Sequence, residues 1–387
     1  MVPHLVTALN GPLLELERRL LESSTSIEGW LRRHWQQHEP PFYASVDLRN
    51  SGFKLAPVDT NLFPGGFNNL GPASTPLAVQ AARGAIGRLC PDAKNLLLVP
   101  ENHTRNRGYQ ENVAALAEIL RQSGLEVRVA PLPLLKREGA RVTVEGFDPC
   151  AILVNNDLSA GIPQVLEGLT EQSVLPPLHA GWAIRRKSQH FAAYDEVAGE
   201  FAQLLGIDPW LVNPYHASCG RIDFQARAGE ECLASNVATL LERIRAKYLE
   251  YGLKETPYVV VKADAGTYGM GIMMVRDPAE VKDLNRKQRN KMAVVKEGLE
   301  VEQVILQEGV HTLERIDEKA AEPVVYMIDR HVIGGFYRVH AARGADENLN
   351  APGMEFAPFG SEFPAYGVVA RLALAAAALE LERTAPR

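Results

Sequence analysis

The sequence contains few cysteines, and no two of them are spaced like the ligands of a zinc site. Its 387 residues include four cysteines, at positions 90, 150, 219 and 232, and no Cys-x-x-Cys motif. Four cysteines in a chain of this length argue against a disulfide-rich secreted scaffold and against a zinc ribbon. A reducing cytoplasm is therefore the expected location.

An excess of positive charge and a long apolar run are also missing. The 41 lysines and arginines are outnumbered by 47 acids, which argues against a dedicated nucleic-acid binder because such proteins need positive surface. The apolar stretch 368–379 contains Arg371 and is shorter than the roughly 20 residues that span a bilayer. Residues 1–10 lack the basic and apolar regions of a signal peptide. We expect small-molecule substrates and neither nucleic acid nor membrane as partners; a homo-oligomer stays open.

Short apolar segments that alternate with amphipathic ones predict an α/β fold. Residues 95–100, 126–130 and 151–154 read as buried strands, and 108–122 reads as an amphipathic helix between the first two. This alternation predicts an open, largely parallel sheet. Beyond a boundary near residue 180, two long helices are followed by hairpin strands. The sequence therefore predicts two domains.

The sequence has neither the Gly-Lys-Ser/Thr motif of a P-loop nor a Gly-x-Gly-x-x-Gly motif after a strand, so a dehydrogenase is a weak alternative. Its clearest glycine motif spans 259–275, where a β-branched strand carrying Lys262 leads through a glycine-rich loop into a second strand. Glycines let backbone N–H groups approach phosphate oxygens. The pattern predicts a flap over phosphates, although a plain glycine hairpin would read similarly. The candidate flap residues are Gly266, Thr267, Tyr268, Gly269 and Gly271.

Two later segments place polar residues at strand ends. Gln307 and Glu308 close an apolar strand, where they are placed to hold an adenine edge and a ribose hydroxyl; an ordinary strand end is the alternative. Arg338 lies on one face of a later strand, before an Asp-Glu-Asn-x-Asn cluster. Such oxygen ligands suit Mg²⁺ in a nucleotide site, although an acidic surface loop would look the same. The candidate metal ligands are Asp329, Glu347, Asn348 and Asn350.

The segment 45–70 reads as a loop that binds a ligand. It combines cations for carboxylates with amides and acids for an ammonium group, and these polar groups need partners once nearby aromatics bury them. A second polar cluster follows the strand at 95–100, where ligands bind in open α/β sheets. A structural loop is the alternative for the first segment. The candidate substrate-binding residues are Asp47, Arg49, Asn50, Lys54, Asp59, Asn61, Asn68, Asn69, Glu101, His103 and Arg105.

The features after residue 180 together resemble the ATP-grasp family. Its members carry a lysine-bearing strand with a glycine flap, a strand ending in Gln-Glu or similar, and a late Asn-Leu-x-Ala-x-Gly metal segment. The segment 348–353 is similar to the last of these, with Pro352 where glutathione-synthetase-like members carry Gly. This departure leaves open whether Asn348 or Asn350 binds the metal. The resemblance also implies a second ATP-binding lysine upstream, for which Lys187 is the candidate.

Over most of its length, the chain resembles the proteobacterial glutamate–cysteine ligase family of ATP-grasp type. The resemblance rests on four segments in order: VDLRNSGFKLAPVDTNLFPGGFNNL, PENHTRNRGY, HAGWAIRRKSQHF and VVVKADAGTYGMGIMMV. It implies an N-terminal open (pre-ATP-grasp-like) α/β domain at 1–180 that binds amino acids and an ATP-grasp domain at 181–387 that binds nucleotide. It also implies the first step of glutathione synthesis, in which ATP, L-glutamate and L-cysteine give γ-glutamylcysteine, ADP and phosphate.

Such a reaction has to activate a carboxylate, which is a poor electrophile. Phosphoryl transfer from ATP to the glutamate side chain makes an acylphosphate that an amine attacks, and it depends on positioning and charge neutralisation. We expect Lys187 and Lys262 to neutralise phosphates and Arg338 to stabilise the acylphosphate, with no enzyme nucleophile. Another ATP-grasp carboxylate–amine ligase, or a non-catalytic ATP-binding regulatory protein, is the alternative.

Overall fold

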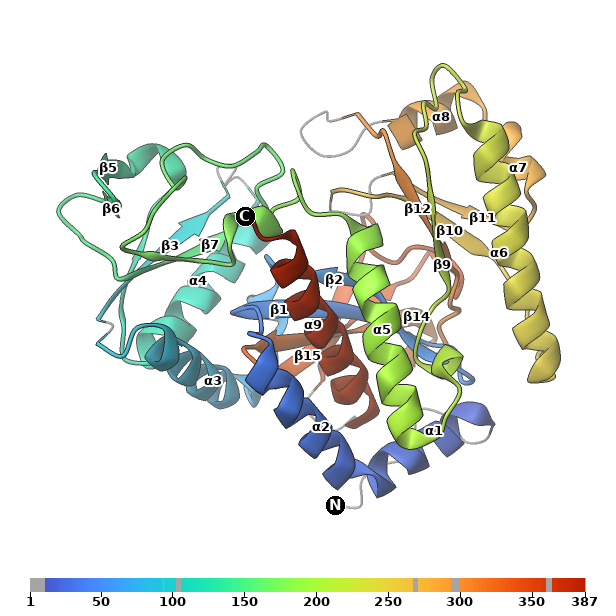
Figure 1. Cartoon of the computed structure of the whole chain (residues 1–387), viewed down its shortest axis with the longest axis horizontal. Coiled ribbons are helices and arrows are strands. Elements are labelled where there is room, and N and C mark those ends of the chain that lie inside the picture. The colour runs from blue at the N-terminus through green and yellow to red at the C-terminus, as the bar shows by residue number, and fades with distance from the viewer. Residues whose placement is uncertain are drawn as a thin grey trace.

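The strands in the described part of the chain form three larger sheets and one two-stranded ribbon, with helices over the sheet faces (Figure 1). This is the α/β class that the sequence predicts. The computed structural model describes residues 11–92, 94–101, 106–266, 271–293, 300–359 and 364–386. The flap residues Thr267, Tyr268 and Gly269 and the substrate candidates His103 and Arg105 lie outside these ranges.

The largest sheet joins strands from the two ends of the chain. Its order is β16-β15-β14-β1-β2, with antiparallel neighbours and with β13 beside β14. The hydrogen bonds of β1 are completed by β14, so the boundary expected near residue 180 does not separate the strands of this sheet. Its strands are β1 Tyr43–Asn50, β2 Leu55–Asn61, β13 Arg315–Ile316, β14 Lys319–Ile328, β15 His331–His340 and β16 Glu355–Phe359.

The second sheet carries the glycine motif. It is antiparallel in the order β11-β10-β12-β9, and Lys262 at the end of β10 lies between Ile272 of β11 and Ile305 of β12. The strand–loop–strand reading of 259–275 is therefore confirmed for the described residues. Helix α6, Glu230–Glu250, packs against this sheet. The strands are β9 His216–Cys219, β10 Val259–Ala263, β11 Ile272–Val275 and β12 Val304–Glu308.

The third sheet is the parallel one expected in the N-terminal half. Its order is β4-β3-β7-β8, and all its neighbours run parallel. Helix α3 packs on α4 and also on β14 and β15, so it joins the parallel sheet to the largest sheet. The elements are α3 Ser74–Leu89, β3 Asn95–Pro100, α4 Arg107–Gln122, β4 Glu126–Val129, β7 Ala151–Asn155 and β8 Ser173–Leu175.

Helix α9, Pro364–Thr384, forms the centre of a helical layer beside the largest sheet (Figure 1). It contacts α5, α1 and β2, and Glu380 on it forms a buried ion pair of 2.7 Å with Arg185. Among the described helices it alone is long and apolar enough to cross a membrane, but 78% of its apolar window is buried, as in a core helix. The remaining α-helices and strands are α1 Pro12–Glu22, α2 Ser24–Gln37, β5 Lys136–Glu138, β6 Arg141–Thr143, α5 Lys187–Leu205, α7 Ala279–Lys282 and α8 Arg286–Ala293.

Candidate active site

A pocket lies between β1 and β2 of the largest sheet and β10, β11 and β12 of the second sheet. It brings together residues that are scattered along the sequence, from position 47 to position 350. Eleven of the predicted site residues line it. They are Asp47, Arg49, Asp59, Lys187, Lys262, Gly266, Gln307, Glu308, Glu347, Asn348 and Asn350.

Two lysines meet at one end of this pocket. Lys187 donates to the carboxylate of Asp59 at 2.7 Å, and its ammonium group also lies 4.2 Å from the centre of the Trp182 ring. Burial alone would raise the pKa of Asp59, but the charges of Lys187 and Lys262 lower it to about 2. Asp59 is therefore ionised at neutral pH and holds a cluster of positive charge, as an anion-binding site requires.

Hydrogen bonds from the start of α5 to Asp264 hold Lys187 at the pocket. Lys187 donates its N–H to the carbonyl of Asp264 at 2.8 Å, and the Asp264 side chain accepts hydrogen bonds of 2.7 Å from the N–H and hydroxyl of Ser188. A carboxylate there satisfies N–H groups in the first turn of α5 that have no partner within the helix. The end of β10 is thereby fixed to the start of α5, which carries Lys187.

Lys262 spans the pocket from one sheet to the other. From β10, its ammonium group donates to Gln307 Oε1 on β12 at 2.6 Å and to the carbonyl of Val58 on β2 at 2.7 Å. Burial lowers the pKa of Lys262 to about 8, despite the nearby charge of Asp59. The pocket encloses only about 80 Å³, less than the ~300 Å³ lower bound for ligand sites. The Lys262–Val58 contact connects the two sheets across this small space.

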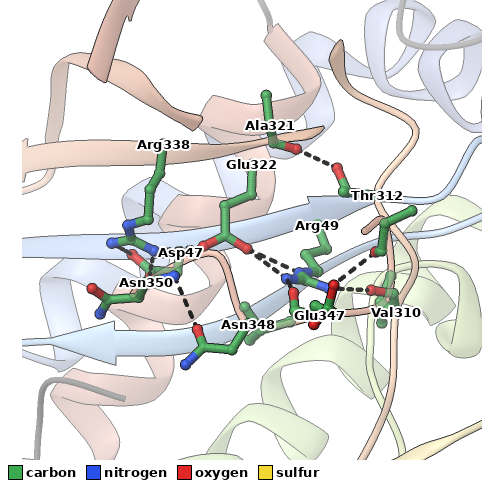
Figure 2. A network of polar contacts seen from close by, with 12 residues as sticks. Asp47, Arg49, Val310, Thr312, Ala321, Glu322, Arg338, Glu347, Asn348 and Asn350 are labelled. Carbon is green, nitrogen blue, oxygen red and sulfur yellow. Dashed lines mark hydrogen bonds and ion pairs between the residues drawn. The ribbon is translucent and has the colours of Figure 1, made fainter. Parts of the chain in front are cut away.

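A network of arginines and carboxylates forms another part of the pocket wall (Figure 2). Glu322 on β14 accepts from Arg49 Nε at 2.9 Å and from Arg338 Nη1 at 2.6 Å, and Arg338 also donates to Asp47 at 2.8 Å. Burial raises the pKa of Asp47 in spite of the adjacent guanidinium. For Glu322, the charges of Arg49 and Arg338 overcome burial and lower its pKa. Glu322 lines the pocket. Arg338 does not, but it donates hydrogen bonds to Asp47 and Glu322, which do.

Sequence reasoning missed Glu322. The residue interrupts the apolar run of β14, and a single charged residue inside a buried strand was the available signal. Its partners lie on β1 and β15, the two strands that flank β14 in the sheet. The network is therefore visible only once the strand order is known.

The predicted metal segment lies beside this network (Figure 2). Asn348 Oδ1 accepts the N–H of Asn350 at 3.0 Å, and both side chains line the pocket together with Asp47. Among the described residues, no three His, Cys, Asp or Glu side chains form a metal-binding group. The available amide and carboxylate oxygens fit a Mg²⁺ ion that takes most of its ligands from phosphates and water.

Two of the expected nucleotide and substrate residues pair with each other. Lys54 donates to the Glu308 carboxylate at 2.6 Å, and both side chains are fully buried. Trp210 Nε1 and the N–H of Tyr215 also donate to this carboxylate. Glu308 lines the pocket, but its carboxylate is already engaged by protein donors.

The structure places the other predicted residues outside the pocket lining. Asn50 donates to Glu314 at 2.6 Å, and Asn61 Oδ1 accepts the N–H of Phe63 at 2.9 Å. Asp329 lies in the turn between β14 and β15, where Arg88 contacts it at 2.7 Å. These side chains have structural partners instead of a place in the pocket. Asn68, Asn69 and Glu101 also lie away from it, as does Gly271, whose carbonyl accepts the N–H of Ala263.

A second cavity of about 430 Å³ adjoins the first one. The two share Ala263 and Gly266 in their linings. Ser159, which follows the parallel strand β7, and Trp182 also line the second cavity. This cavity therefore lies where the carboxyl edge of the parallel sheet approaches the second sheet.

The chain matches a family model and is closely similar to a solved structure. The family model described as GshA, glutamate-cysteine ligase, matches residues 17–134 and 130–381. A candidate γ-glutamylcysteine synthetase from Methylobacillus flagellatus KT has a solved structure that is 58% identical, with a TM-score of 0.91 and 99% of each chain covered. No curated protein matches the chain significantly.

Two further solved structures are only remotely similar. A glutathione synthetase-like effector from Globodera pallida is 10% identical over 90% of this chain and 82% of its own, with a TM-score of 0.39. D-alanyl-alanine synthetase A from Vibrio cholerae O1 biovar eltor str. N16961 is 10% identical over 68% of this chain and 73% of its own, with a TM-score of 0.33. Similarity at this level supports no inference about the pocket.

Proposed function

Because the chain belongs to the glutamate–cysteine ligase family, we propose that the pocket between β2 and β10 is the site at which ATP activates glutamate. The chain is a ligase that joins L-glutamate to L-cysteine, the first step of glutathione biosynthesis. One observation carries the proposed location: Lys187 and Lys262, from separate elements, flank the same carboxylate of Asp59 in one buried pocket.

The lysine cluster receives the triphosphate of ATP. The phosphates replace Asp59 and the Val58 carbonyl as partners of Lys187 and Lys262, which neutralise negative charge during phosphoryl transfer. Gly266 and Gly271 begin and end the flap over these phosphates. Gln307 offers a polar side chain beside Lys262, on the strand where we expect the adenine to lie.

A Mg²⁺ ion bound with ATP would supply neutralisation of the phosphate charge. Asn350 or Asn348, together with Asp47, would hold it from the protein side, because these oxygens line the pocket next to the arginine network. Glu347 also lines the pocket and is the alternative acid; its carboxylate accepts from Arg343 and from the N–H of Gly344, as that of Asp47 accepts from Arg338.

In this proposal Arg338, which lies just behind the pocket lining, stabilises the activated glutamate. The oxygen of the glutamate side-chain carboxylate attacks the γ-phosphorus of ATP, ADP leaves, and an acylphosphate results. The amine of cysteine then attacks the acyl carbon and phosphate leaves, so no thiol of the enzyme is consumed. The guanidinium of Arg338 is held by Asp47 and Glu322, which fixes its position before substrate binds.

The second cavity gives the amino acids a way to reach the nucleotide. It meets the ATP pocket at Ala263 and Gly266, so a group bound in one can contact a group bound in the other. The carboxyl ends of parallel strands, such as the one before Ser159, are common ligand sites in α/β proteins. We propose the reducing cytoplasm as the location of this reaction.

Phosphate release tests the proposal. The purified protein is incubated with ATP, Mg²⁺ and glutamate together with one amine from a panel that includes cysteine, glycine, alanine and a polyamine. We expect the fastest release with cysteine and mass-spectrometric detection of γ-glutamylcysteine. Release that is independent of glutamate, or equal for all amines, would contradict the proposal.

A further inference from the structure

Two of the four cysteines lie next to each other, away from the proposed active site. The sulfur atoms of Cys219 and Cys232 are 3.8 Å apart. Cys219 is the last residue of β9 and is buried, whereas Cys232 lies in the first turn of α6 and is exposed. Neither lines the ATP pocket or the adjoining cavity. The pair therefore has no part in the ligation chemistry.

The backbone between the two cysteines holds them in this arrangement. Asp223 and Ala228 exchange two backbone hydrogen bonds of 3.0 Å, and Ile222 donates its N–H to the carbonyl of Glu302 at 2.9 Å. Gly229 has a φ of +85°, and a Cβ atom there would lie 2.8 Å from the carbonyl oxygen of Arg221. Only glycine fits this position without strain. The segment is thus a closed loop that places α6 against the end of β9.

The two thiols differ in how they can react. An external disulfide can reach exposed Cys232 but not buried Cys219, and burial together with the neighbouring thiol of Cys232 raises the pKa of Cys219. Redox-active pairs in proteins often consist of an accessible attacking thiol and a neighbouring resolving thiol. Cys232 is the accessible thiol of this pair, and Cys219 is the neighbouring resolving thiol.

We propose that Cys219 and Cys232 form a reversible disulfide by exchange with a low-molecular-weight disulfide of a cysteine-containing peptide. The Cys232 thiolate attacks one sulfur of that disulfide and releases one peptide thiol, which leaves a mixed disulfide on Cys232. The Cys219 thiolate then attacks Cys232 Sγ and releases the second peptide thiol. Two protein thiols are oxidised and one external disulfide is reduced to two thiols. The sulfurs have to approach from 3.8 Å to about 2.05 Å.

This disulfide would connect α6 covalently to the sheet that carries the ATP pocket. Cys219 lies opposite Val304 in the pairing of β9 with β12, and β12 carries Gln307 at the pocket. Oxidation of this pair by external peptide disulfides would therefore act on the same sheet that carries Lys262.

The test uses the full chain with Cys90→Ser and Cys150→Ser, because Cys150 Sγ and Cys90 are also neighbours. The reduced protein is incubated with glutathione disulfide, and free thiols and intact mass are measured before and after a dithiol reductant. We expect the loss of both thiols, a mass decrease of two hydrogen atoms and full reversal. Two free thiols, or a stable adduct of one glutathione, would overturn the proposal.

Two single variants in the same background identify the order of attack. Cys219→Ser should keep a glutathione adduct on Cys232, because the resolving thiol is gone. Cys232→Ser should keep its remaining thiol free, because Cys219 is buried. Equal adduct formation in both variants would overturn the assignment, and Cys→Ala versions replace any serine variant whose circular dichroism shows misfolding.

Discussion

The ammonium group of Lys187 lies 2.7 Å from a carboxylate oxygen of Asp59, although 128 positions separate the two residues in the sequence. Lys187 begins α5, and Asp59 lies on β2 of the largest sheet. Asp59 keeps the cation in the pocket by supplying a negative charge, a role that we propose phosphates take over when ATP binds. This contact therefore connects the fold of the chain to the proposed binding of ATP.

Replacing Lys262 should strongly reduce turnover without unfolding the protein. Lys262→Ala removes a charge that we propose stabilises the transferred phosphoryl group, and the loss of such a contact typically costs about 10²–10³-fold in kcat. Phosphate release in the presence of glutamate and cysteine measures the loss, and circular dichroism measures the fold. Lys254→Ala, at an exposed position, is the control and should keep full activity. An unchanged kcat in Lys262→Ala would remove the residue from the site.

ATP binding should weaken as the pH rises above about 8. The pKa of Lys262 is lowered by burial to about 8, so above this pH the free protein loses the charge that attracts phosphates. The dissociation constant for ATP should then rise by up to about tenfold per pH unit. Binding is measured by calorimetry without amino acids, so that their own titration does not contribute.

The titration of Lys262 does not unfold the protein at high pH, so unfolding does not explain the expected loss of ATP binding. Because the pKa of Lys262 in the folded state lies below its unfolded value of 10.5, the group destabilises the fold as pH falls from 10.5 to 8 and stabilises it as pH rises through that range. Lys262→Arg keeps its charge throughout and should remove the pH dependence. A slope that persists in this variant would assign the titration to another group.

Removing the charge of Glu322 should destabilise the fold. Glu322→Gln keeps the shape but leaves Arg49 and Arg338 without the carboxylate they share, and breaking a buried ion pair costs about 3–5 kcal/mol. Chemical denaturation measures the free energy of unfolding. The matched control is Glu355→Gln, whose partner Lys319 is on the surface, and it should leave the stability unchanged. Equal stability of both variants would show that the network contributes little.

Substitutions of two predicted metal ligands, Asn350 and Asp329, should differ in their effect on the Mg²⁺ concentration that the reaction requires. Asn350→Ala removes an oxygen that lines the pocket and should raise the Mg²⁺ concentration needed for half-maximal rate severalfold. Asp329→Asn should leave this concentration unchanged, because Asp329 lies in a turn beside Arg88, outside the pocket lining. The rate is measured at fixed ATP over a range of Mg²⁺. The opposite pattern would place the metal at the turn.

The sequence was sufficient to predict the local elements. The strands predicted at 95–100 and 151–154 and the helix predicted at 108–122 agree with β3, β7 and α4 to within one residue, because apolar periodicity depends on neighbouring residues alone. The strand–loop–strand at 259–275 likewise follows from β-branched residues and glycines. The pairing of β1 with β14 does not, because it joins segments from opposite ends of the chain.

The site was predictable in its residue types but not in their partners. Lys54 and Glu308 were both expected to contact ligands, and the fold instead buries them against each other. Asn50 and Asn61 likewise bond to the protein itself. A polar residue in a loop needs a hydrogen-bond partner, but its sequence position does not say whether the protein or a substrate provides it.

Oxygen transfer from glutamate to phosphate tests the central claim most directly. Glutamate labelled with ¹⁸O in its side-chain carboxylate is incubated with ATP, Mg²⁺, cysteine and the protein, and the phosphate is analysed by mass spectrometry. If ATP activates this carboxylate as an acylphosphate, each phosphate released carries one labelled oxygen. Unlabelled phosphate formed alongside γ-glutamylcysteine would contradict the account.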